Sequence, residues 1–226
     1  MSDIDALQGF LGKWRARWPE WAIAETFIPE AQREVAQAWL ALREEISEAA
    51  WGGEDPRPGD AKLGWWTEEL MGWSRGARRH PLGQVLQKRA APWAELASAL
   101  PSLAATREPA RDMEAGLQRL VPYADAVSAV AQQLFEADAR APVHNVAVSL
   151  MAERLLLAAV DGDGSAPAAT QARQLLAVWP QPSLGTGPGR VHAALVRGRL
   201  ARRVKGRQDP LPRFAALLAS WRAARG

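Results

Sequence analysis

Apolar residues recur at helical spacing along nearly the whole of this 226-residue chain. Leu63, Trp66, Leu70 and Trp73 are the clearest case, because residues three and four positions apart share one face of a helix. β-branched residues are too sparse and scattered to give the alternating pattern of strands. The sequence therefore predicts an all-α fold, with helices near 4–14, 30–50, 61–78, 80–88, 92–104, 111–137, 143–160, 168–178, 191–203 and 210–224.

The composition predicts one folded unit. With 48% hydrophobic and 23% charged residues, the chain can bury one substantial core, so we expect a single domain over residues 1–226. The 18 glycines and 16 prolines gather around 52–59, 161–167 and 180–189, where we expect loops. Pro122 falls inside the predicted helix 111–137 and lacks an N–H group, so a kink or break is expected just before Tyr123.

Cysteine and histidine usage excludes several kinds of site. The chain has no cysteine, which rules out disulfides and thiolate metal sites, and its three histidines argue against a histidine-rich zinc site. The first residues, MSDIDALQGF, lack the basic and then apolar order of an export signal. No apolar run approaches the ~20 residues that a membrane-spanning helix needs. We therefore expect a cytoplasmic protein.

Basic residues are concentrated between Arg190 and Arg207, although the net charge is only +3 and the pI about 9.8. This run is open to two interpretations: docking to phosphates of a prenyl diphosphate, a lipid head group or an acidic protein partner, or a solvated helix surface. The solvated surface is favoured, because runs of like charge are usually exposed. Neither a helix-turn-helix signature nor aromatic residues accompany the run, so no nucleic-acid partner is expected.

Three of the eleven tryptophans, Trp14, Trp18 and Trp21, lie close together near the N-terminus beside basic residues. Such a segment could rest on a membrane surface, which would make the protein a peripheral membrane protein. The favoured alternative is that these indoles pack onto the domain, as amphipathic helices commonly do.

The predicted helix after Pro29 has one clearly apolar stripe and several glutamates. At 100° per residue the stripe contains Val35, Trp39, Leu42 and Ile46. Glu44 and Glu48 lie nearly opposite this stripe, so we expect them in solvent. Glu45 lies on the flank beside small alanines, and it is the acid that we expect to face a cavity.

Two stretches of the chain resemble the squalene/phytoene synthase family. Phe27-Ile28-Pro29 through Arg33 resembles the start of the helix that carries the family's acidic motif. Ala61–Leu86 contains Trp65-Trp66-Thr67-Glu68-Glu69-Leu70, like the family's "W-W-x-E-E-L" helix, followed by His80-Pro81. The resemblance covers roughly residues 27–134, and it implies a helical bundle of the isoprenoid synthase type around a central cavity.

In this family, aspartate-rich motifs hold the Mg²⁺ ions that bind the substrate diphosphate. The nearest match here is Glu44-Glu45-Ile46-Ser47-Glu48, and an alignment that keeps Arg43 at the family's usual arginine moves these glutamates off the aspartate positions. The expected second motif, in the helix 143–160, is reduced to Glu153. Diphosphate ionisation needs metal charge at the leaving oxygens, so the resemblance implies a member that has lost this chemistry. No cofactor is assigned, and Mg²⁺ is expected only if the protein is an active enzyme.

Other polar motifs carry weaker predictions. Asp161-Gly162-Asp163-Gly164-Ser165 resembles the start of a calcium loop, but Ala172 stands where the loop needs glutamate, so a polar turn is expected. His80 precedes a proline at a helix start, where capping or packing is favoured over catalysis. His144 and His192 are interpreted as isolated.

Two hypotheses follow from the resemblance. The favoured one is a catalytically degenerate protein of isoprenoid metabolism that acts by binding an isoprenoid diphosphate, another lipid or a protein partner. The alternative is an active prenyl-diphosphate transferase that catalyses head-to-head condensation with a glutamate-rich first motif. Catalytic residues are not assigned. The candidate cavity or ligand-binding residues are Arg33, Glu45, Trp66, Glu69, Tyr123 and Glu153, and the candidate metal ligands are Glu44, Glu45 and Glu48.

Overall fold

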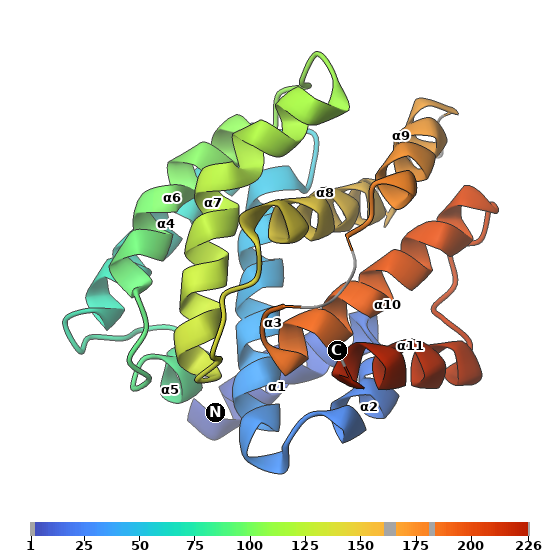
Figure 1. Ribbon diagram of the computed structural model, residues 1–226. Coiled ribbons are helices and arrows are strands. Elements are labelled where there is room, and N and C mark those ends of the chain that lie inside the picture. Colours follow the sequence, from blue (N-terminus) through green and yellow to red (C-terminus); the bar gives the residue numbers. More distant parts are fainter. Residues whose placement is uncertain (1–2, 161–165, 181–183, 226) are drawn as a thin grey trace.

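The computed structural model describes residues 3–160, 166–180 and 184–225, and these residues are all helix, turn and loop, as the periodicity predicts (Figure 1). The elements in chain order are α1 (Asp3–Arg17), α2 (Trp21–Ala24), the 3-10 turn η1 (Glu25–Phe27), α3 (Glu30–Trp51), α4 (Pro56–Trp73), α5 (Gly83–Leu86), α6 (Trp93–Ala105), α7 (Met113–Leu134), α8 (Val143–Val160), α9 (Ala166–Ala177), α10 (Gly187–Val204) and α11 (Arg213–Arg225).

Helix α3 runs through the middle of the molecule, with α4, α6 and α7 on one side and α8 and α10 on the other (Figure 1). The predicted stripe of Val35, Trp39, Leu42 and Ile46 is buried, which confirms that part of the sequence analysis. Polar side chains of α3 are buried as well, among them Arg43. A central helix is covered on several faces at once, and this is why its polar residues lie inside the protein.

Short polar caps start three of the helices. Asp55 accepts a hydrogen bond from the backbone N–H of Arg57 and is followed by Pro56, which suits the first turn of α4 because that N–H would be unpaired. Asp112 accepts from Ala115 N at the start of α7, and Thr186 accepts from Gly189 N at the start of α10. These caps fix where each helix begins.

Most predicted helices are found, but several boundaries differ. The third helix begins five residues earlier than predicted, because Asp55 and Pro56 start it, and it ends at Trp73 rather than Arg78. Gly76 has φ +82°, and the backbone N–H of Ala77 donates to Gly72 O, which closes the helix end. The sequence analysis missed α2 and η1, which have only four and three residues.

A kink or break is expected from the sequence just before Tyr123, and the break is absent, because α7 continues through Pro122 as one helix. Pro122 and Gln118, whose carbonyl loses its usual donor, are both exposed. Water can therefore solvate that carbonyl, and the missing hydrogen bond is tolerated. The segment Asp161–Ser165, interpreted as a polar turn, lies outside the described residues.

The N-terminal tryptophans belong to the core. Trp14, Trp18 and Trp21 are 4%, 6% and 0% exposed, so their indoles pack onto the domain as the favoured interpretation has it. Helix α1, predicted at 4–14, extends to Arg17 and lies against α3. Within the described part of the chain, no helix is both long enough and apolar enough to cross a bilayer.

Candidate functional site

A cavity of about 90 Å³ lies between α3, α7, α8 and α10. Its walls are mainly apolar, with Trp39 on α3, Val127 and Ala131 on α7, Val146 on α8 and Ala193 on α10. Alanines at two of these positions leave the space that larger side chains would fill. Helices from three separate parts of the chain, α3, the consecutive pair α7 and α8, and α10, thus line one mainly apolar chamber.

The segment between α9 and α10 forms one wall of this cavity. Trp179, Pro180 and Leu184, which we call the cavity mouth, line it there. Leu184 is exposed, so the cavity meets the protein surface beside it. Arg190 holds this wall in place, because its guanidinium donates to Gly185 O at 2.5 Å and to Ala223 O of α11 at 3.0 Å.

A buried polar cluster borders the cavity at Arg43 and Ser149. Arg43 Nη2 donates to Glu153 Oε1 at 2.8 Å, and Ser149 Oγ donates to the same oxygen at 3.2 Å. His192 Nδ1 lies 3.8 Å from that oxygen. Burial raises the pKa of Glu153 and lowers the pKa of His192 well below its usual value, so the imidazole is neutral at physiological pH. Arg43 opposes the effect of burial on Glu153, and the 2.8 Å contact makes the two side chains an ion pair inside the bundle.

Tyr123 lies next to this ion pair and is fully buried, and its hydroxyl makes no hydrogen bond within the described residues. Burial raises its pKa, so the phenol stays protonated. The Nε group of Arg43 is also buried without a hydrogen-bond partner there. Buried polar atoms are paired in most proteins, so a bound molecule with a polar atom could complete these two groups.

A second cavity, of about 220 Å³, lies on another side of the same ion pair. Trp18, Glu44, His192 and Arg199 line it together with Arg43 and Glu153. The interpretation of His192 as isolated is therefore wrong, since its ring also lies 4.8 Å from the Trp18 ring. In the sequence, His192 shares one helix face with Leu195 and Val196, and a polar residue within such an apolar stripe is a signal of burial.

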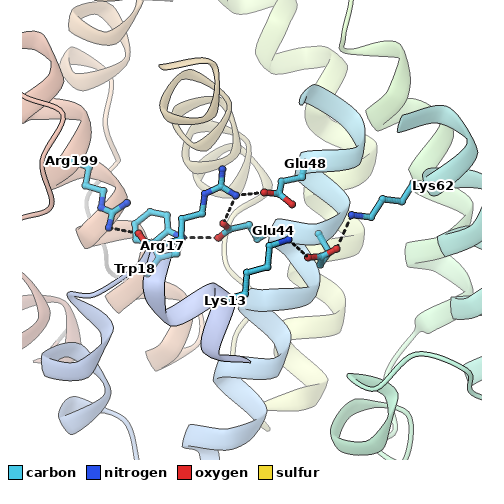
Figure 2. A network of polar contacts seen from close by, with 8 residues as sticks. Lys13, Arg17, Trp18, Glu44, Glu48, Lys62 and Arg199 are labelled. Carbon is cyan, nitrogen blue, oxygen red and sulfur yellow. Dashed lines mark hydrogen bonds and ion pairs between the residues drawn. The ribbon is translucent and has the colours of Figure 1, made fainter. Parts of the chain in front are cut away.

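The three glutamates of the Glu-rich motif, Glu44, Glu45 and Glu48, face α1 and α4 rather than solvent (Figure 2). Arg17 of α1 pairs with both Glu44 and Glu48, and Trp18 Nε1 donates to Glu44 at 2.7 Å. The expectation that Glu44 and Glu48 are solvated is wrong, because α1 covers the face of α3 opposite the main core. Burial raises the pKa of Glu44 despite its cationic neighbour.

Glu45 also has cationic partners. Lys62 of α4 donates to Glu45 at 2.7 Å, and Lys13 of α1 lies 3.7 Å away (Figure 2). Glu45 does not line the central cavity, but it borders a separate hollow between α1 and α3. Glu45 therefore faces a cavity, as expected, but Glu44 and Glu48 line the same hollow, which measures about 330 Å³.

These residues do not fit the magnesium site that the family resemblance implies. Each of Glu44, Glu45 and Glu48 is ion-paired with a lysine or arginine, and Glu153 is paired with Arg43. A hard cation needs several oxygen ligands, and a carboxylate that is already paired with a lysine or arginine is poorly placed to be one of them. In the described ranges, no three His, Asp or Glu side chains are placed to hold one metal ion.

Glu69 is a structural acceptor outside the central cavity. Its carboxylate accepts hydrogen bonds from the backbone N–H groups of Arg79 and His80 and from Trp73 Nε1, at 2.7–2.8 Å. Burial alone would raise its pKa, but these donors hold the pKa of Glu69 below its usual value. Glu69 thus anchors the loop between α4 and α5 in its charged form.

His80 and Trp66 belong to an aromatic cluster on the same side of the bundle. The His80 ring lies 4.6 Å from Trp66 and 4.5 Å from Phe10, and its Nδ1 accepts from Leu82 N. Burial lowers the pKa of His80 to about 4. The predicted capping and packing role of His80 is confirmed. Trp66 is 1% exposed and packs within this cluster.

Of the predicted cavity or ligand-binding residues, Tyr123 and Glu153 both lie close to Arg43, and Glu153 lines the second cavity, but neither lines the central cavity. Arg33 does not join them, because its Nε donates to Ile28 O at the start of α3. The sequence analysis did not assign Ser149 or His192 to the site. Both lie on helices for which the resemblance is faint, so only their place on an otherwise apolar face could have indicated them.

The basic run Arg190–Arg207 is only partly solvated. Arg199 pairs with the buried Glu20, and its guanidinium lies 4.0 Å from the Trp18 ring centre. Leu211 N donates to the same Glu20 carboxylate at 2.7 Å, so this glutamate ties α10 and the start of α11 to the N-terminal segment. The favoured interpretation of a solvated surface is wrong for Arg190 and Arg199 and holds for Arg197 and Arg207.

Comparisons of the chain with protein-family models, with curated proteins and with solved structures find no match.

Proposed function

We propose that this chain is a squalene/phytoene synthase-like protein with an isoprenoid synthase type of bundle, and that it acts by binding rather than by diphosphate chemistry. Its ligand is an isoprenoid or similar lipid with a branched apolar chain and a polar atom. The observation that carries the proposal is the apolar cavity between α3, α7, α8 and α10, with Arg43 at its border. Such chambers, mainly apolar with a few convergent polar groups, are the usual form of small-molecule sites.

The size of the cavity limits how the ligand sits. At about 90 Å³ the enclosed space holds a short branched segment rather than a whole prenyl chain. The rest of the chain would then extend along the cavity mouth at Trp179 and Leu184. Arg43 Nε has no hydrogen-bond partner in the described structure, and it offers a donor to a hydroxyl or carbonyl oxygen on the ligand.

The ion pairing of the glutamates supports binding over turnover. Mg²⁺ bound by Glu44, Glu45 and Glu48 would have to displace Arg17, Lys13 and Lys62 from them. None of the three glutamates lines the central cavity, so a metal there would be away from the chamber that suits the apolar chain.

Filling the cavity should weaken the binding of isoprenoid alcohols. We expect farnesol and geranylgeraniol to quench tryptophan fluorescence saturably, since Trp39 and Trp179 line the cavity. Ala131→Phe places a ring in the chamber and should weaken binding at least tenfold. A loss of this size is roughly the binding free energy of one buried aliphatic segment. Fluorescence titration measures the affinities, and thermal melting checks that the variant folds.

Gln133→Phe is the matched control, because it adds the same ring at an exposed position of α7. It should bind both alcohols like the wild type. The absence of saturable quenching in the wild type would count against the proposal, as would wild-type affinity in folded Ala131→Phe.

A further inference from the structure

Helix α11 carries an apolar face that nothing in the described chain covers. Phe214, Leu217 and Trp221 are 74%, 43% and 43% exposed. They follow helical spacing on one side of α11, which we call the outer face of α11. The opposite side, with Ala216 and Ala223, is buried against the protein. Single exposed apolar residues are ordinary, but three on one helix face mark a contact surface.

Arginines flank this outer face on both sides. At 100° per residue, Phe214, Leu217 and Trp221 occupy an arc with Arg213 at one edge and Arg222 at the other. Arg225 lies over the Trp221 ring at 4.8 Å from its centre. No acidic residue occurs within Arg213–Arg225. The pattern of aromatic and aliphatic residues between arginines is that of a helix lying in a membrane interface.

The charge around α11 points to an anionic partner. Residues 187–226 contain ten of the 28 lysines and arginines but only one of the 25 acidic residues, Asp209. The rest of the chain has 18 basic and 24 acidic residues and is therefore net negative. Arg197, Lys205 and Arg207 are exposed in this stretch, whereas Arg199 pairs with Glu20 and Arg202 with Asp209. Two copies joined through this face would bring like charges together, which disfavours a symmetric dimer.

The position of α11 and its exposed tryptophan favour a bilayer over a protein groove. Helix α11 lies at the edge of the bundle, packed on α10, α2 and η1 (Figure 1). Trp221 is the most exposed of the eleven tryptophans, and the other ten are buried or half-buried. A tryptophan beside arginines suits the head-group region, where the ring contacts acyl chains and the guanidinium contacts phosphates.

We propose that the outer face of α11 docks the protein on an anionic lipid bilayer. The helix lies in the membrane plane, Phe214, Leu217 and Trp221 enter the boundary between head groups and acyl chains, and Arg213 and Arg222 contact lipid phosphates. This surface is distinct from the N-terminal tryptophan segment, whose indoles are buried. None of the five residues lines the central cavity, so docking does not depend on the proposed ligand.

Vesicle co-sedimentation of the full chain tests the proposal. We expect binding to phosphatidylcholine vesicles that contain phosphatidylserine, weak binding to phosphatidylcholine alone, and a loss of binding as salt is raised. Phe214→Ser with Trp221→Ser should weaken binding roughly tenfold or more, because two inserted rings are lost. Arg213→Gln with Arg222→Gln should weaken it by about fivefold per charge.

The matched control substitutions lie on other parts of the surface. Val121→Ser removes an exposed apolar residue from α7, and Arg75→Gln with Arg78→Gln removes two exposed charges from the loop after α4. Both should bind vesicles like the wild type.

Insertion of Trp221 can be followed by quenching of tryptophan fluorescence with brominated phosphatidylcholine. This quenching should fall in Trp221→Phe, which keeps an apolar ring on the outer face of α11 but removes its tryptophan.

Three results would overturn membrane docking. The first is vesicle binding that Phe214→Ser with Trp221→Ser leaves unchanged. The second is equal binding to neutral and anionic vesicles. The third is a wild-type dimer in light scattering that the same two substitutions dissociate, since a second copy would then occupy the outer face of α11. Loss of farnesol binding in Ala131→Phe with intact vesicle binding separates this proposal from the proposed function.

Discussion

Arg43→Met should lower the free energy of unfolding by about 3–5 kcal/mol at neutral pH, the range for breaking a buried ion pair by removing one partner. The substitution leaves the Glu153 carboxylate buried without its cation, although Ser149 still donates to it and the neutral His192 lies 3.8 Å away. Urea denaturation followed by circular dichroism measures the change.

The loss of unfolding free energy in Arg43→Met should depend on pH and should be smaller at lower pH. Without Arg43, the folded-state pKa of Glu153 rises further above its unfolded value, so the folded state binds more protons than the unfolded state. The stability deficit of the variant relative to the wild type should therefore shrink as the pH is lowered from neutral. A stability deficit that does not change as the pH is lowered would argue against an uncompensated carboxylate as its cause.

Two further variants complete the test. Arg43→Met with Glu153→Leu removes both charges and should recover most of the lost stability, because an apolar pair of similar volume is often neutral or stabilising. Arg140→Met breaks the exposed pair with Asp125 and should cost less than about 1 kcal/mol. Equal losses in Arg43→Met and Arg140→Met would show that the central pair is not buried as described.

Glu69→Ala should cost about 3 kcal/mol or more, the second-largest effect that we expect. The substitution leaves the N–H groups of Arg79 and His80 and the Trp73 indole without their acceptor. Each buried donor left unpaired costs about 1–3 kcal/mol. Glu68→Ala, at the adjacent exposed position, should change stability by less than about 0.5 kcal/mol.

Glu69→Ala also tests the role given to this residue. A structural anchor predicts that ligand affinity, measured at a temperature where the variant is folded, stays near that of the wild type. Loss of farnesol binding in a folded Glu69→Ala variant would instead favour Glu69 as a ligand-binding residue.

The fold class follows from the sequence because helix periodicity is a local property. The stripe of Val35, Trp39, Leu42 and Ile46 is visible in the sequence alone and is buried as predicted. Helix ends are set by single caps, and the Asp55–Pro56 start of α4 was read as part of a loop. Helix boundaries of this kind are mispredicted because glycine and proline occur both in loops and at helix ends.

The candidate site could be predicted only in part. Glu153 was identified through the family resemblance and pairs with Arg43, and Tyr123, also predicted, lies beside this pair. The partners of Glu44 and Glu48 could not be predicted, because the helical wheel of α3 does not show which other helix covers its polar face. Arg17 and Glu48 are 31 residues apart, and Arg43 and Glu153 are 110 apart. Pairs at such separations depend on the tertiary packing.

The most direct test of the account compares farnesol and farnesyl diphosphate by calorimetry, in Mg²⁺ and in EDTA, with pyrophosphate release assayed in the same samples. An apolar site without metal chemistry predicts saturable farnesol binding, affinities for both molecules that change less than about twofold between Mg²⁺ and EDTA, and no pyrophosphate. Binding of the diphosphate that requires Mg²⁺ and is followed by pyrophosphate release would contradict the account.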